Sequence, residues 1–425
     1  MPPLLGQIRW RILALLLLVT VINFVDRQSL SVVAPILRDE LKLSNTDYGF
    51  IVGAFQFGMM AGEFPMGWLM DRRGTRIGLT FAVIWWSLAN ALHAFARSAV
   101  QFASLRFWLG TGECGNYSGG MKVVSAWFPV KERTLAVGIF NGGSMLGSII
   151  APPLLAWLTL AYGWHAAFVL PSALGLVWAV LWWRNYYPPA EHPQLSPAEQ
   201  DYISADRIPA TTPPATRDLL QRRQAWAIMA CRMLVGPVVQ FYIFWLPEFL
   251  YRQHGFNLKT IGMFAWLPFL FGDIGSIMGG WVAGRLISRG WSVTKTRRFT
   301  MGLGAACCLM SLAVALSASA FYAMAFICVV LFGHTFLSAN MFSSISDMFP
   351  PEAVGRVTAL TGIAGGLSGV IFPLLTGMLV DKFSYTPVFV LAAGMPALGC
   401  LALFLTVRRL EPADTASPAT RSAAQ

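Results

Sequence analysis

The chain has 425 residues, of which 56% are hydrophobic and only 12% are charged, and its formal net charge is +11. Soluble domains carry roughly 25% charged residues, so this composition excludes an ordinary soluble globule and an intrinsically disordered chain. A chain this apolar is typical of a helical protein that crosses a membrane many times.

Twelve apolar runs along the chain are long enough to cross a bilayer as helices, which takes about 20 residues each. An even number of crossings puts both chain ends on the same side of the membrane. The sequence therefore predicts an all-α membrane protein with twelve transmembrane helices. The runs are Trp10 to Val32, Tyr48 to Met70, Ile77 to Ala96, Val100 to Met121, Thr134 to Leu160, Trp164 to Trp183, Ala225 to Leu250, Thr260 to Leu286, Phe299 to Ala318, Phe321 to Ile345, Val357 to Val380 and Val388 to Val407.

The positive charge follows this topology. Most of the 31 Lys and Arg residues fall in loops on the side that both chain ends share. Cytoplasmic loops carry an excess of basic residues, so both termini of this multi-pass membrane protein are predicted to be cytoplasmic. The basic surplus is thus explained by contact with the lipid bilayer and its cytoplasmic face, and no nucleic-acid partner is expected.

A long polar interval, residues 184–224, separates the sixth and seventh runs and is rich in proline. We expect an N-terminal six-helix bundle at residues 1–187, a cytoplasmic linker at 188–224, a C-terminal six-helix bundle at 225–412 and a cytoplasmic tail at 413–425. A short helix is predicted near Ser196 to Ala205, because Ser196 and Glu199 have capping-box spacing. Two bundles joined in this way are typical of transporters built from repeats.

A weak internal repeat supports the division into two halves. The string GWLMDRRGTR follows the second run, and GWVAGRLISRG follows the eighth run. Acidic and basic residues in such a loop can pair across the cytoplasmic face when the bundles rock. We therefore predict a gating loop in the first copy; the plainer interpretation is a basic stop between helices. The second copy has Gly284 where the first has Asp71. The residues predicted for the gating loop are Gly67, Asp71, Arg72, Gly74 and Arg76.

Away from the ends of the predicted spans, seven Asp, Glu and Arg residues lie inside them. A charge at a helix centre costs about 2.5 to 3.5 kcal/mol on insertion scales, so each of these groups must pair, take up a proton or face water. Ionisable groups in such places are candidates for function. They are Asp26, Arg27, Glu63, Arg106, Glu113, Arg232 and Asp273.

Spacing predicts how four of these groups are directed. Asp26 and Arg27 are neighbours, about 100° apart around their helix, so they can address different partners. Arg106 and Glu113 are seven residues apart, which offsets them by only about 20°, so both are expected on one face that lines a cavity. A carboxylate whose arginine partner comes and goes can bind and release a proton. The alternative is an ion-pair lock between helices.

Several motifs give the chain a family resemblance. The G-x-x-x-D-R-x-G-x-R string resembles the loop motif of the major facilitator superfamily. The strings NFVDRQSLSVVAP, RFWLGTGECGNYSGGMKVVSAWFPVKERTLAVGIFNGGS, FYIFWLPEFL and HTFLSANMFSSISDMFP resemble the anion:cation symporter family, and within it bacterial hexuronate and galactonate carriers. The resemblance implies the major facilitator fold, proton-coupled symport of an organic anion and a location in a bacterial inner membrane.

The same resemblance implies roles for residues. It gives Asp26 and Glu113 as proton-coupling sites and Arg27 as the partner of the substrate carboxylate. Arg106 would hold Glu113 charged or assist the anion. Further candidates could meet the hydroxyl groups of a sugar acid or form an apolar wall, although each alone is more often a contact between helices. These substrate candidates are Gln56, Asn141, Ser144, Gln240, Tyr242, His334 and Asn340, with Trp245 and Phe342 as walls.

Three intramembrane charges have a less definite interpretation. Glu63 is either an additional proton site or a partner of Arg232 or of a basic loop. Asp273 is expected to bond a neighbouring helix.

We therefore predict a monomeric proton-coupled symporter that imports a small organic anion, above all a hexuronate or related sugar acid. Alternatives are a carrier for another monocarboxylate, dicarboxylate or aromatic acid, and a membrane nutrient sensor that does not transport. An enzyme is disfavoured because the chain lacks H-E-x-x-H and G-x-S-x-G motifs. The six cysteines form no C-x-x-C pair and the histidines have no metal-ligand spacing, so neither a metal nor a cofactor is expected.

Overall fold

The structure, a computed structural model, describes residues 8–204 and 216–410, which form helices and connecting loops. Within these ranges ten helical segments are long and apolar enough to cross a membrane. The second and third predicted runs share one of these segments. The fourth run corresponds to the helix Ala99–Trp127, which is not among the ten segments because of its polar residues. The prediction of an all-helical protein is confirmed for the described residues. The number of crossings stays a prediction.

Five long helices precede the linker, and short 3-10 helices follow α2 and α5. The second helix, α2, contains Gly74 at φ 77°, a left-handed backbone conformation that glycine adopts without strain, and the chain reverses there. The elements are α1 (Ile8–Leu41), α2 (Asn45–Leu92), η2 (His93–Phe95), α3 (Ala99–Trp127), α4 (Val130–Tyr162), α5 (Ala166–Asn185) and η3 (Pro189–Glu191).

The described part of the linker contains two short helices, α6 (Pro197–Ser204) and α7 (Thr216–Leu220). In the second half the eighth predicted run is split into α9 and α10, and the ninth into α11 and α12. The elements are α8 (Arg223–His254), α9 (Leu258–Phe264), α10 (Leu267–Ser288), α11 (Val293–Cys308), α12 (Ser311–Leu316), α13 (Ala320–Met348), α14 (Pro351–Lys382) and α15 (Thr386–Thr406).

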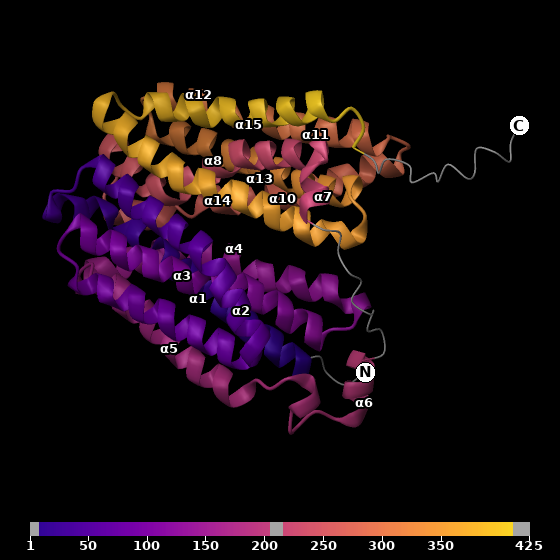
Figure 1. Ribbon diagram of the computed structural model, residues 1–425. Coiled ribbons are helices and arrows are strands. Elements are labelled where there is room, and N and C mark those ends of the chain that lie inside the picture. The colour runs from indigo at the N-terminus through magenta and orange to yellow at the C-terminus, as the bar shows by residue number, and fades with distance from the viewer. Residues whose placement is uncertain (1–7, 205–215, 411–425) are drawn as a thin grey trace, which may run out of the picture.

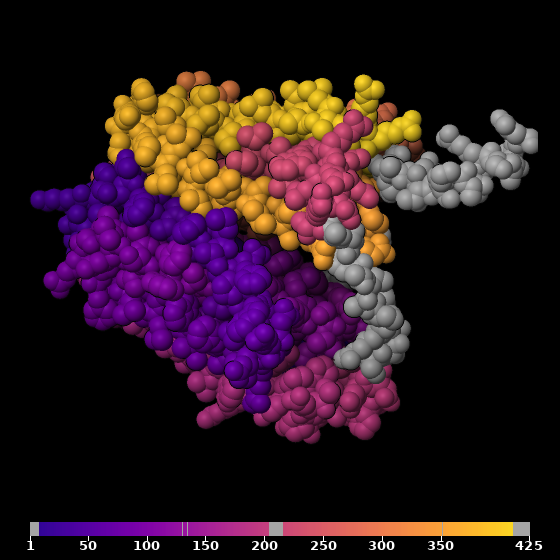
Figure 2. All heavy atoms as spheres, viewed as in Figure 1, coloured from indigo at the N-terminus to yellow at the C-terminus, as the bar shows by residue number. Residues whose placement is uncertain are grey.

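The helices form two layers (Figure 1). Helices α1 to α5 lie together below, and α8 to α15 lie together above. The layers meet on the left and part on the right, where α1 begins and α15 ends. The space-filling view shows a hollow between the layers on that right side (Figure 2). The two halves therefore enclose a cleft that opens on the side where α1 begins and α15 ends.

The predicted linker helix is confirmed as α6, and it is fastened to the first half. The Ser196 hydroxyl accepts a hydrogen bond from the Glu199 backbone N–H at 3.2 Å, as the capping signal indicated. The Glu199 carboxylate bonds the Arg9 guanidinium at 3.2 Å, and the Tyr202 hydroxyl donates to Glu132 at 2.7 Å. The rest of the predicted linker at 205–215, Ala205 included, and the tail at 413–425 lie outside the described residues.

Helices α2 and α3 cross with their backbones in contact. A side chain at Gly58 would run into the backbone of Phe107, and one at Gly110 would run into the backbone of Phe55 and Met59. Only glycine, which has no side chain, allows the two backbones to come this close. Such close packing stabilises the association of helices in membranes. The crossing fixes α3, which carries Arg106 and Glu113, against α2.

Candidate functional site

An ion pair between α1 and α3 forms the centre of the candidate site. The Nε and Nη2 atoms of Arg27 lie 3.0 and 2.9 Å from Oε2 of Glu113. Nη2 also donates to Oδ1 of Asn23 at 3.3 Å. The Glu113 side chain is fully buried, whereas the Arg27 side chain is 16% exposed. Because Arg27 is partly exposed, it can exchange Glu113 for another anion and keep its charge compensated.

Only one of the two carboxylate oxygens of Glu113, Oε2, takes part in this pair. Its Oε1 atom is buried and has no hydrogen-bond partner among the described residues. A buried carboxylate oxygen without a donor is costly, because burial removes water and nothing replaces it. The free oxygen is thus a place where a proton could sit while Oε2 still faces Arg27.

Arg106 is placed differently from the expectation that it lines a cavity. Its side chain is fully buried, and Nη1 donates to the backbone carbonyl of Arg27 at 3.2 Å. The ring of Phe55 lies near both cations, 5.8 Å from the Arg106 guanidinium and 5.4 Å from that of Arg27. No ion pair joins Arg106 to Glu113 in the described ranges. Arg106 and Glu113 are both buried, but Arg106 bonds the backbone of Arg27, whereas Glu113 bonds its guanidinium.

Asp26 points away from this pair, as its angle to Arg27 predicted. It is fully buried, and its Oδ1 accepts a hydrogen bond from Asn90 of α2 at 2.8 Å. The same amide of Asn90 also donates to Ser172 of α5 at 3.2 Å. Asp26 thus lies in the interior of the first half, on a different side of α1 from Glu113, and its proton-coupling role stays a prediction.

Three of the predicted substrate contacts serve as contacts inside the second half, and a fourth, Trp245, packs against both halves. The Tyr242 hydroxyl bonds Ser311 at 3.0 Å, and the His334 Nε2 atom donates to the Val235 carbonyl at 3.0 Å. Asn340 accepts from Arg297 at 2.8 Å and donates to the Gly279 carbonyl at 3.1 Å. The three side chains are buried. Trp245, the fourth, is also buried, and its ring lies edge-on to Tyr48 and Tyr385.

Of the remaining candidates, Gln56 and Ser144 lie where the two halves meet. Gln56 of α2 packs on α14, where a methyl group on Gly369 would lie 3.5 Å from its side chain. Gln240 is half-buried and Asn141 is exposed. The Ser144 hydroxyl donates to the Asn141 carbonyl at 2.6 Å. Phe342 is 41% exposed and lies 5.2 Å from the Arg232 guanidinium.

The three other intramembrane charges lack the partners proposed for them. Neither Glu63 nor Arg232 forms an ion pair within the described residues, so these two groups are not paired with each other here. Asp273 was expected to bond a neighbouring helix, but its carboxylate has no hydrogen-bond partner in the part of the chain that the structure describes. The half-buried Asp273 instead lines a cavity of about 140 Å³ between the two halves.

Among the described residues, the contacts of the predicted gating loop are with the first half. Asp71 forms an ion pair with Lys122 of α3. The Arg76 guanidinium donates to the Trp183 carbonyl at 2.6 Å and lies 3.8 Å from the ring of Tyr187. Arg72 lies 4.7 Å from the ring of Trp68 on its own helix. Gly74 forms the turn, and a methyl group added at Gly67 would face open space among the described residues. Pairing across the halves therefore stays a prediction for another conformation.

An ion network with a buried Arg38–Glu248 pair at its centre, which the sequence analysis missed, closes the end of the cleft opposite to the chain ends. Arg38 of α1 lies 2.5 Å from Glu248 of α8, and Glu248 is fully buried. Arg252 bonds Glu248 at 3.0 Å and also pairs with Asp39 of α1. The Tyr48 hydroxyl donates to the Phe244 carbonyl at 2.6 Å, again across the halves. We call Asp39, Arg38, Glu248 and Arg252 the gate network.

Replacing Glu248 by glutamine is expected to loosen this end. Removing one partner of a buried ion pair costs about 3 to 5 kcal/mol, because the other charge stays buried without compensation. Arg38 and Glu248 belong to different halves, so the substitution destabilises the conformation in which this end of the cleft is closed. Spin labels at the exposed positions Lys42 and Lys259, in a background without the native cysteines, should report a longer distance distribution.

The matched control for this variant is Asp47→Asn. Asp47 lies at the same end but bonds only Ser44 of its own helix start. Its label distances should equal those of the unaltered protein. Identical distances in the Glu248 and Asp47 variants would show that the gate network does not hold this end closed.

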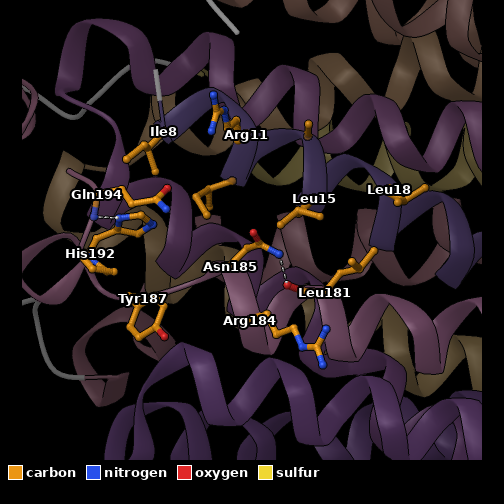
Figure 3. A pocket seen from close by; sticks show the side chains of 13 residues that line it. Ile8, Arg11, Leu15, Leu18, Leu181, Arg184, Asn185, Tyr187, His192 and Gln194 are labelled. Atoms are coloured by element: carbon orange, nitrogen blue, oxygen red, sulfur yellow. Dashed lines mark hydrogen bonds between the residues drawn. The ribbon is translucent and has the colours of Figure 1, made fainter. Parts of the chain in front are cut away.

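A further cavity lies away from the cleft, at the chain-end side of the first half (Figure 3). It measures about 470 Å³ and is formed by α1, α5 and residues 192–194. Its walls include Leu15 and Leu181, with Arg11, Arg184 and Asn185 around them. None of the predicted site residues lines it, and it contains no residue of the second half. This cavity is therefore separate from the candidate site at the Arg27–Glu113 pair.

Known proteins are similar to this chain in sequence and in fold. The profile of the Major Facilitator Superfamily matches residues 16–373 and 290–424. The hexuronate transporter of Escherichia coli (strain K12) is 33% identical over 413 residues, which cover 96% of this chain and 95% of that protein. The galacturonate transporter of Dickeya chrysanthemi is 36% identical over 280 residues, which cover 65% of this chain and 81% of that protein.

Solved structures agree with the fold. A bacterial homolog of the human lysosomal transporter Spinster superposes with a TM-score of 0.78 at 18% sequence identity, over 94% of this chain and 97% of that chain. At this identity the likeness concerns the fold alone.

Proposed function

The chain belongs to the Major Facilitator Superfamily, and we propose that it imports a hexuronate or a related sugar acid together with protons. It is a transporter rather than an enzyme, as the absence of catalytic motifs predicted. The two relatives described above are named for hexuronate and galacturonate. Their similarity over most of the chain supports a sugar acid as the substrate.

We further propose twelve crossings in two six-helix bundles, at residues 1–187 and 225–412, with both chain ends in the cytoplasm of a bacterium. Helix α2 has 48 residues, about 72 Å at 1.5 Å per residue, more than twice the hydrocarbon thickness of about 30 Å. Counted as two crossings about the Gly74 turn, and with α3 added to the ten apolar segments, α2 brings the number to twelve. The protein would act as a monomer.

The Arg27–Glu113 pair carries the proposal of symport. With Glu113 ionised, Arg27 is held by it, and an anionic substrate must compete with a carboxylate that is already in place. A proton on Glu113 removes that competitor, and Arg27 then offers its planar guanidinium to the substrate carboxylate. Uptake of the proton and capture of the anion thus support each other, so both enter together.

The gate network and the open cleft describe one half of the cycle. In this conformation the cleft faces the chain ends, from which substrate and proton would leave on import. Closing there would require Asp71, Arg72 and Arg76 to find partners on the second half, and opening at the other end would break the Arg38–Glu248 pair.

Purified protein in liposomes tests the proposal. Labelled galacturonate, glucuronate, galactonate and a plain monocarboxylate are offered under an inward proton gradient, and empty liposomes serve as the control. The sugar acids should accumulate above their level without the gradient, and the monocarboxylate should not. Accumulation of another acid class instead would favour the alternative carriers, and binding without any uptake would favour a nutrient sensor.

A further inference from the structure

Asp273 is an intramembrane carboxylate that the proposed transport cycle does not use. It lies on α10 and is half-buried, and it lines the cavity of about 140 Å³ between the halves. Helices α1 and α4 of the first half and α8, α10 and α13 of the second half all contribute to this cavity. A charge in such a place is costly unless water or a ligand meets it.

The cavity lies next to Arg27. Phe24 is one of the residues that line it, and the Phe24 ring lies 4.6 Å from the Arg27 guanidinium. The aromatic ring therefore forms a wall shared by the cavity and the Arg27–Glu113 pair. A sugar whose carboxylate reaches Arg27 could lay its ring on Phe24 and extend its other end into the cavity.

The chemistry of the cavity suits hydroxyl groups. Among its lining residues Ser144, Ser148 and Thr335 carry hydroxyls, and the described residues place no basic side chain in its wall. The hydroxyls of Ser144 and Thr335 already donate to backbone carbonyls. Their oxygens can still accept hydrogen bonds, as can the carboxylate oxygens of Asp273. The cavity thus offers mainly acceptors to the far end of a bound molecule.

We propose that Asp273 determines the substrate class, by accepting hydrogen bonds from the hydroxyls of a sugar monoacid and repelling the second carboxylate of a sugar diacid. A hexuronate has a carboxylate at one end of its carbon chain and hydroxyls along the rest. Galactarate carries a carboxylate at each end, so binding to Arg27 brings its second carboxylate towards Asp273. Like charges brought together in this way oppose binding. This inference rests on the proposed transport of sugar acids.

The experiment measures binding of labelled galacturonate to the full-length purified protein, with galacturonate and galactarate as competitors. The unaltered protein should prefer galacturonate. In Asp273→Asn, which keeps the size and an acceptor oxygen but removes the charge, the preference for galacturonate over galactarate should fall at least about tenfold. Glu63→Gln is the matched control, because Glu63 is another unpaired carboxylate in a predicted span but does not line this cavity. Its preference should stay unchanged.

A second measurement does not depend on any variant. Converting one carboxylate of galactarate to an amide removes the second charge, so the unaltered protein should bind the monoamide more tightly than galactarate. An unchanged preference in Asp273→Asn, or equal binding of galactarate and its monoamide, would overturn the role of Asp273. Absence of galacturonate binding and uptake in the unaltered protein would instead overturn the proposed function.

Discussion

Glu113→Gln protein is expected to lose concentrative uptake while it still exchanges substrate across the membrane. Glutamine resembles a protonated glutamate in size and charge, but it cannot release a proton. Arg27 would then be permanently free of its carboxylate competitor, so the anion could bind from either side. The cycle could still carry substrate in both directions, but no proton would accompany it and the gradient could drive nothing.

Two measurements in liposomes separate these effects. Uptake of labelled galacturonate under an inward proton gradient reports coupling, and exchange of labelled for unlabelled galacturonate without a gradient reports binding and movement. Glu40→Gln is the control, because the Glu40 carboxylate accepts from Trp164 within the first half at 2.8 Å. Gradient-driven accumulation that persists in Glu113→Gln would remove Glu113 from proton coupling.

Arg27→Lys protein is expected to bind a sugar acid much more weakly. In the structure two nitrogens of Arg27 donate to one oxygen of Glu113, so the fork of the guanidinium is already directed at a carboxylate. Lysine keeps the charge but offers a compact point charge without this fork. Loss of a hydrogen bond to a charged group costs about 1.5 to 3 kcal/mol, which corresponds to a Kd about 10- to 150-fold higher.

Equilibrium binding of galacturonate measures this change, since it does not require the transport cycle. Arg97→Lys provides the same chemical replacement at an exposed position outside the cleft, and its Kd should not change. A wild-type Kd in Arg27→Lys would show that Arg27 does not contact the substrate.

Local features of the site could be read from the sequence. The angle between Asp26 and Arg27 follows from helix geometry alone, and the structure indeed directs them to Asn90 and to Glu113. The α6 helix follows from the capping residue Ser196. Both inferences need only residues within one helix, where spacing determines direction.

Contacts between helices were less accessible. Arg38 and Glu248 are separated by 210 positions, and each alone reads as a loop or span-end charge. His334 and Asn340 are polar residues on an apolar helix, a pattern that fits a ligand contact and a helix contact equally well; the structure shows bonds to Val235 and Arg297. Asp273 was expected to bond a neighbouring helix, but it lines a cavity between the halves. Which polar group meets a neighbour depends on how two helices are rotated, and hydrophobic patterning does not specify that rotation.

The glycine crossing of α2 and α3 has a mechanical consequence. Because the two backbones touch at Gly58 and Gly110, no soft side chain lies between them to absorb a displacement. Lys122, farther along α3, is tied to Asp71 at the far end of the same α2 segment. We therefore expect the two helices to move as one rigid unit, so that a displacement of the loop at Asp71 also displaces Glu113.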